Sequence, residues 1–253
     1  MLLLAHVSDL HIDGTPRAAA RAERVLAFLD ELPRQVDAVL LTGDLADHGT
    51  QEEYEQLRHL LRERQRFLLC PGNHDARGPY RHVLLDEPAG DERDDEPINR
   101  AHELPGLRVL MLDSTIPGRA DGCLTEETLA WLAEQLRRTP TTPTLVAFHH
   151  PPVELHSPFI DAIRQRGEDR LAAVLAVHPQ VVAVLCGHAH TAAVSSFAGR
   201  PLLVTPGVAS TLRLPWETSL HLDRAMPPAL AFHVLDGDYR ITTHYRSVPD
   251  AAD

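Results

Sequence analysis

The feature that most constrains the fold of this chain is a series of short apolar runs separated by amphipathic stretches. Runs with the length and composition of buried strands occur at residues 2–7, 38–41, 67–70, 107–112, 144–148 and 181–186. Helical patterns lie between them, at 18–32, after Thr50, from about residue 125 and at 169–177. Thr50 and Glu53 have the spacing of a capping box, which predicts the start of a helix. Such alternation of strand and helix is typical of a layered α/β domain.

The pattern changes after His190, where residues 194–197, 202–205, 229–235 and 239–245 have strand patterns without helices between them. This predicts an antiparallel portion of sheet near the end. Because 253 residues with 43% hydrophobic content can bury a full core, we expect residues 1–253 to form a single domain. The segment 86–97 is rich in Asp, Glu and Pro, and we interpret it as a solvated insertion.

The charge balance excludes one class of partner. The chain has 24 Lys and Arg against 36 Asp and Glu, a formal net charge of -12. Long nucleic acids are therefore not expected, because their binding relies on cations that displace counterions. A small phosphate compound remains compatible with this charge, since bound metal ions would supply local positive charge.

The cysteines and the apolar segments indicate a location. Three cysteines, an odd number without metal-site spacing, favour a reducing compartment. The apolar opening 1–7 is too short for the core of a signal peptide, and no apolar stretch approaches the roughly 20 residues that span a bilayer. We therefore expect a cytoplasmic protein without membrane contact.

Polar residues follow nearly every strand in the first part of the chain. They are Asp9 and His11, then Asp44, then Asn73, His74 and Asp75, then His149 and His150, and finally His188 and His190. In open α/β sheets, functional sites form where the carboxyl ends of the strands meet, so these groups are expected to converge. Each group alone is compatible with a surface turn, but five such groups in order indicate a common site.

At these residues the sequence resembles the calcineurin-like metallophosphoesterase superfamily, whose DxH, GD, GNH, H and GHxH motifs occur here in order. The segments SDLHI, TGDLADHG, PGNHD, HHPP and GHAHT, with LDS, PG and the GxLTxxxLxWL run, are most similar to class III cyclic nucleotide phosphodiesterases and glycerophosphodiesterases. The resemblance implies a four-layer αββα sandwich of two mixed β-sheets flanked by helices.

The resemblance also implies a site with two transition-metal ions, Mn, Fe, Zn or Co. One ion would be bound by Asp9, His11, Asp44 and His190, and the other by Asp44, Asn73, His149 and His188. Oxygen and imidazole ligands suit such borderline ions. A hydroxide that bridges the ions would attack phosphorus.

Other residues receive weaker assignments. His74 resembles the histidine that protonates the leaving oxygen, and Asp75 is predicted to orient its ring. His150 is expected to pack or to support the ligands, and His6 to lie near the site. The remaining histidines are interpreted as ordinary surface or core groups, and Trp216 as a residue that packs in the core or in its loop. We expect the long segment 206–228 to form a loop or cap near the active site, which keeps base stacking by Trp216 open.

The expected substrate is a small phosphodiester, most specifically a 3',5'-cyclic nucleotide such as cAMP, with glycerophosphodiesters and broad phosphoesterase activity as alternatives. His48 stands where related protein phosphatases have an arginine that clamps a phosphate dianion, which favours a monoanionic diester. A scaffold without activity is disfavoured because all seven ligand positions are filled. We also expect a homodimer.

Overall fold

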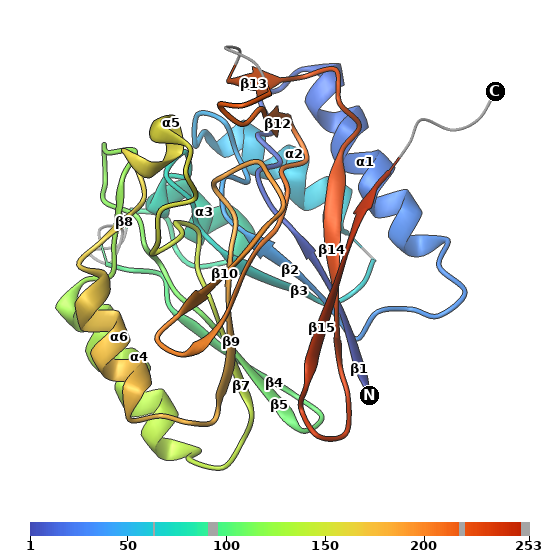
Figure 1. Ribbon diagram of the computed structural model, residues 1–253. Helices are drawn as coiled ribbons and strands as arrows, with labels where there is room; N and C mark the ends of the chain where they lie inside the picture. Colours follow the sequence, from blue (N-terminus) through green and yellow to red (C-terminus); the bar gives the residue numbers. More distant parts are fainter. Residues whose placement is uncertain (63, 91–95, 218–220, 249–253) are drawn as a thin grey trace.

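Two β-sheets lie face to face at the centre of the molecule, with helices on both outer sides (Figure 1). The computed structural model describes residues 1–62, 64–90, 96–217 and 221–248. Three apolar layers hold these parts together, one between the sheets and one beneath each set of helices. The predicted αββα sandwich of two mixed sheets is therefore confirmed.

The first sheet has the strand order β15-β14-β1-β2-β3. Its members are β1 (Leu2–Val7), β2 (Ala38–Thr42), β3 (Phe67–Cys70), β14 (Ala229–Leu235) and β15 (Ile241–Ser247). The strands β1, β2 and β3 are parallel, whereas β14 and β15 pair antiparallel. The predicted antiparallel portion near the end of the chain thus joins the sheet through β1.

The second sheet has the order β10-β11-β9-β7-β5-β4. Its members are β4 (Arg100–Leu104), β5 (Leu107–Met111), β7 (Thr144–Ala147), β9 (Val181–Cys186), β10 (Ala193–Phe197) and β11 (Arg200–Val204). The four inner strands are parallel, and the edge strands β4 and β10 are antiparallel to their neighbours. Both sheets therefore direct the carboxyl ends of their central strands toward loops that can share one site.

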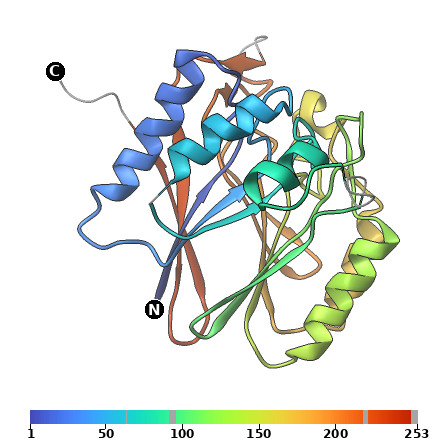
Figure 2. The same ribbon diagram turned by 180° about the vertical axis from the view of Figure 1, so that it is seen from behind.

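Six helices and two small sheets complete the described chain. They are α1 (Pro16–Asp30), α2 (Gln51–Leu61), α3 (Arg77–Leu84), α4 (Glu126–Arg138), α5 (Pro158–Asp161) and α6 (Glu168–Ala176), with β6 (Gly122–Cys123) pairing β8 (Gln165–Arg166) and β12 (Thr211–Leu212) pairing β13 (Leu222–Asp223). Figure 2 shows α1, α2 and α3 in a row across the outer face of the first sheet. The helices α4 and α6 lie side by side over the second (Figure 1).

Local signals explain which elements were predictable. The capping box of Thr50 and Glu53 is present at the start of α2, as predicted. The helix α3 was not predicted, because Gly78 and Pro79 are poor helix formers; the proline is tolerated within the first turn. The edge strand β4 was missed because it is mostly polar. Of the predicted insertion 86–97, residues 91–95 lie outside the described residues.

Candidate metal centre

The seven predicted ligands come from the ends of five parallel strands in both sheets. Asp9 and His11 follow β1, Asp44 follows β2, Asn73 follows β3, His149 follows β7, and His188 and His190 follow β9. Hydrogen bonds join the loops after β1 and β2, with the Asp9 and His11 amides donating to the carbonyls of Gly43 and Asp44 at 3.1 and 3.0 Å. The face-to-face sheets thus bring residues from distant parts of the chain to one edge.

The backbone at this edge is strained. Five of the predicted ligands have left-handed backbone conformations, with φ of 57° at Asp9, 45° at His11, 49° at Asp44, 66° at His188 and 49° at His190. Such conformations cost non-glycine residues on the order of 1–3 kcal/mol each and cluster at functional sites. The strained positions coincide with five of the seven predicted ligands.

Asp9, His11 and His190 form the first of two groups. The Nε2 atoms of His11 and His190 lie 3.2 Å apart, and His190 Nε2 lies 3.5 Å from Oδ1 of Asp9. The other nitrogen of His190 lies 2.9 Å from Oγ of Ser210. With this Nδ1 contact orienting the ring, the Nε2 lone pair is directed at the same point as that of His11.

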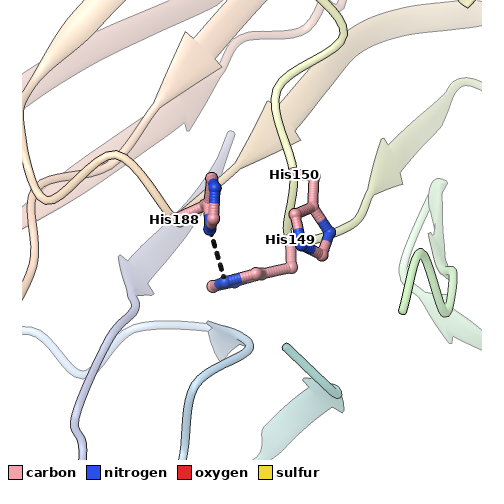
Figure 3. Close-up of side chains that lie close together, drawn as sticks. All are labelled: His149, His150 and His188. Carbon is pink, nitrogen blue, oxygen red and sulfur yellow. Dashed lines mark hydrogen bonds between the residues drawn. The ribbon is translucent and has the colours of Figure 1, made fainter. Parts of the chain in front are cut away.

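The second group contains His149 and His188. His149 Nδ1 donates to the carbonyl of Thr42 at 2.7 Å, which orients the ring so that Nε2 faces the carboxylate of Asp44. This Nε2 lies 3.2 Å from Nδ1 of His188 (Figure 3). It also lies 3.2 Å from Oδ2 of Asp44. Since Asp44 Oδ2 is also 3.6 Å from His11 Nε2, its carboxylate lies between the two groups.

The donor set fits cations on a direct structural criterion. Among the described residues, neither carboxylate oxygen of Asp9 nor Oδ1 of Asn73 has a hydrogen-bond partner, although all three atoms are buried. A buried carboxylate without a partner is costly, and a bound cation would compensate it. Asp9, His11 and His190 have ligand atoms close enough together to hold one ion, and so do Asp9, Asp44 and His149.

Burial and neighbouring charges shift the pKa values of Asp44, His149 and His188. Burial disfavours the charged form of His149, but the neighbouring Asp44 outweighs it and raises the pKa of His149 to about 9. Burial likewise acts against ionisation of Asp44, yet His149 holds the pKa of Asp44 well below its usual range. Burial and the nearby imidazoles of His150 and His149 lower the pKa of His188, so that this ring is neutral. Without a cation, one proton thus occupies the Asp44–His149 contact.

His150 lies beside this group but its nitrogens are already engaged. Figure 3 shows its ring next to those of His149 and His188, and the three rings form a cluster compatible with a metal ion. However, His150 Nδ1 lies 2.8 Å from Oγ of Ser114, and Nε2 lies 3.2 Å from the carbonyl of Ala120. Its geometry therefore agrees with a supporting role.

His74 and Asp75 lie in the same loop but face different partners. His74 is half exposed and donates from Nδ1 to the carbonyl of Asp47 at 2.8 Å. Asp75 instead accepts from the amides of Leu45, Ala46 and Gly72 and from the hydroxyl of Tyr54; these bonds span 2.8–3.2 Å. The predicted orientation of the His74 ring by Asp75 is therefore wrong: the Asp75 carboxylate holds the backbone of the neighbouring loop.

Two residues of this site were missed in the sequence. Asp47 Oδ1 lies 2.7 Å from His11 Nδ1 and orients that ring, and Ser210 does the same for His190. Asp47 lies three residues after Asp44, within the TGDLADHG segment, whereas nothing local marks Ser210. His6 contacts Thr42 Oγ1 at 2.8 Å and the buried His233 at 3.0 Å, so both of its ring nitrogens are engaged by residues that are not predicted ligands.

A cleft of about 220 Å³ opens over the ligands. Its lining includes His11, Asp44, Asn73, His74, His188 and His190, the cationic Arg17 and Arg224, and the apolar Phe159, Ile160, Ile163 and Leu222. The segment 206–228 contributes Ala209, Ser210, Leu222 and Arg224 to this lining. Trp216 is 70% exposed, so its interpretation as a packed residue is wrong.

His48, considered above in place of a phosphate-binding arginine, is also exposed. Its Nδ1 lies 2.6 Å from Glu53 at the start of α2. It is absent from the cleft lining, as far as the chain is described.

Sequence and structure comparisons agree with this geometry. A family model described as calcineurin-like phosphoesterase matches residues 2–192. A cAMP/cGMP dual specificity phosphodiesterase of Mycobacterium tuberculosis is 32% identical, covering 83% of this chain and 68% of that protein. A glycerophosphodiester phosphodiesterase GpdQ of Enterobacter lignolyticus is 31% identical, covering 92% and 86%. A dimetal phosphatase structure from Danio rerio has a TM-score of 0.67 at 14% identity, covering 98% and 96%, which shows a common fold.

Proposed function

The chain belongs to the calcineurin-like phosphoesterase family, and we propose that it hydrolyses 3',5'-cyclic nucleotides such as cyclic AMP at a centre of two metal ions. It is a metallophosphoesterase whose relatives are named phosphodiesterases. The observation that carries the proposal is the convergence of two pairs of imidazoles on Asp9 and Asp44 at the floor of the cleft. A cleft lined by apolar side chains with a few convergent polar groups is the usual form of a small-molecule site.

We assign the ligands to two ions. Asp9, His11 and His190 would hold one ion, Asn73, His149 and His188 would hold the other, and Asp44 would serve both. Carboxylate, amide and imidazole ligands without a thiolate suit Mn, Fe, Zn or Co. Two such ions, when bound, polarise the phosphoryl oxygens and lower the pKa of a water molecule so that it attacks at neutral pH.

The protein's own contribution to bond breaking is assigned to His74. The Asp47 carbonyl engages Nδ1, so that Nε2 is the nitrogen available to the ester oxygen that departs. This step requires His74 with a proton on both ring nitrogens. As water adds to phosphorus and releases one proton, one P–O ester bond breaks, and the departing oxygen takes the Nε2 proton of His74, which a proton from the solvent then replaces. The product is a nucleoside monophosphate. Asp75 acts indirectly, since it fixes the loop that carries Asp44 through Leu45 and Ala46 and its own loop, which carries His74, through Gly72.

A glycerophosphodiester is the second candidate substrate, favoured by the similarity to GpdQ over most of both chains. Rates on a panel of cyclic AMP, cyclic GMP, glycerophosphocholine and a dinucleotide separate the candidates. The proposal expects the largest kcat/KM for a cyclic nucleotide. A larger value for glycerophosphocholine would replace it with the second candidate.

Other properties stay proposals. We propose a single domain over residues 1–253 and a cytoplasmic location. We also propose a homodimer, which sedimentation of the full chain would test. The buried free thiols of Cys70 and Cys186 agree with a reducing compartment. No described helix has both the length and the apolar character needed to cross a membrane.

A further inference from the structure

An aromatic face lies at the mouth of the cleft. Phe159 belongs to α5, and its ring stacks on that of His221, with centroids 5.2 Å apart and an interplanar angle of 12°. His221 precedes β13, so the pair joins two segments that are far apart in sequence but meet at the same end of the molecule (Figure 1). Phe159 is 45% exposed although it lines the catalytic cleft.

This exposed ring is unusual for its position. The neighbouring Ile160 is buried and anchors α5, while Phe159 stays at the surface with Leu222 beside it in the cleft lining. Apolar groups that line a cleft containing polar ligands typically contact the apolar part of a small molecule. His221 covers one face of the Phe159 ring, so the opposite face of this exposed ring is a flat apolar surface suited to another flat ring.

We propose that Phe159, supported by the stacked ring of His221, is the stacking surface for the heterocyclic base of the substrate, and thus a specificity determinant; the inference rests on the proposed nucleotide phosphodiesterase function. Aromatic side chains bind any base through its flat face, so Phe159 accepts adenine and guanine alike. The trimethylammonium group of glycerophosphocholine also binds aromatic faces. Arg17 and Arg224 line the same cleft, but so do Asp13 and Asp47, so its charges do not select against a cationic headgroup, and turnover of glycerophosphocholine by the variants decides between the two ligands.

Binding of two compounds, one with a base and one without, to the manganese-loaded protein tests the proposal. Adenosine 5'-monophosphate carries a base and ribose 5-phosphate lacks it, while the phosphate is shared. Phe159→Ala should weaken binding of adenosine 5'-monophosphate by about 10- to 100-fold, the range for loss of one base-stacking contact. Binding of ribose 5-phosphate should not change.

Three variants serve as controls. Phe159→Tyr keeps the flat ring and should bind adenosine 5'-monophosphate like the wild type, whereas Phe159→Leu keeps only the apolar character and should lose affinity like the alanine variant. Trp216 is an exposed aromatic residue of the segment that carries His221, and it is not among the described residues of the cleft lining. Trp216→Ala should therefore leave both affinities unchanged.

The outcomes separate this inference from the proposed function. Equal effects of Phe159→Ala on both ligands, or no effect on either, would overturn base stacking. A loss confined to glycerophosphocholine turnover would also overturn it and assign the face to the trimethylammonium group. Failure of the wild type to hydrolyse any cyclic nucleotide refutes the proposed function. The affinities for adenosine 5'-monophosphate and ribose 5-phosphate would still report whether Phe159 contacts a base.

Discussion

The carboxylate of Asp47 lies 2.7 Å from Nδ1 of His11, while the carbonyl of Asp47 accepts a hydrogen bond from Nδ1 of His74 at 2.8 Å. One residue therefore orients a proposed metal ligand and the proposed general acid. In both rings Asp47 contacts Nδ1, and Nε2 is the nitrogen left for the metal ion or for the departing oxygen. Its contact with His11, which raises the pKa of that ring against the effect of burial, also makes the ring more basic as a ligand.

Asp47→Asn should weaken binding of the ion at Asp9, His11 and His190 by about 10- to 100-fold, the usual effect of losing the partner of a metal-bound histidine. Titration of chelator-treated protein with Mn²⁺ measures the loss. Asp13→Asn is the matched control, because Asp13 also lines the cleft but accepts its hydrogen bonds from Thr15. Equal affinities in wild type and Asp47→Asn would contradict the positioning role.

Metal binding should depend on pH through His149. In the metal-free protein the pKa of His149 is raised to about 9, so its Nε2 carries a proton at neutral pH that a cation must displace. Affinity should therefore rise with pH up to about pH 9, and binding near neutral pH should release a proton. Calorimetry in buffers of different ionisation enthalpy detects that release. An affinity that is constant across this range would exclude the predicted exchange.

Competition between protons and bound metal at the histidine ligands predicts how the activity of the metal-loaded protein responds to acid. Activity should fall below about pH 6, near the ordinary histidine pKa, as protonation competes with the metal. Added metal should partly restore it. If circular dichroism shows unfolding in the same range and metal restores nothing, loss of the fold is the cause instead.

His74→Ala should slow hydrolysis of a cyclic nucleotide by about 10² to 10³ fold, the range for proton transfer by a side chain. The loss should be much smaller for p-nitrophenyl diesters, whose leaving group needs no proton. Metal content must be equal in both proteins, because the His74 amide donates to Oδ1 of Asp44 at 2.9 Å. Equal losses on both substrates would remove the general-acid role.

Gly72 tests the close packing behind the centre. A Cβ atom at this position would lie 2.3 Å from both the backbone nitrogen and Oδ1 of Asp44. Gly72→Ala should lower the free energy of unfolding by about 1–3 kcal/mol, as overpacking does, and should displace a metal ligand. Gly237→Ala is the control, since its Cβ would meet no described atom within 4 Å. Urea denaturation and metal content that match the wild type would contradict the packing.

The sequence predicts the parts of this structure that local patterns specify. Apolar periodicity and the Thr50 cap identify the main strands and α2, and the ends of the strands point to the ligand positions. The contacts of Asp75 were wrongly predicted because its partner is the backbone of another loop, which only tertiary packing brings near. Ser210 and Phe159 were missed for the same reason, since their approach to the site depends on how distant loops fold back over the sheets.

The number of ions that restore activity tests the two-metal centre most directly. Chelator-treated protein should be inactive on cyclic AMP and should regain turnover as two equivalents of Mn²⁺ bind per chain. Asp44→Ala, which removes the carboxylate between the two groups, should stay folded and inactive at the same metal concentration, and Asn73→Ala should also lose turnover. Full turnover by a folded, metal-depleted Asp44→Ala protein would contradict the account.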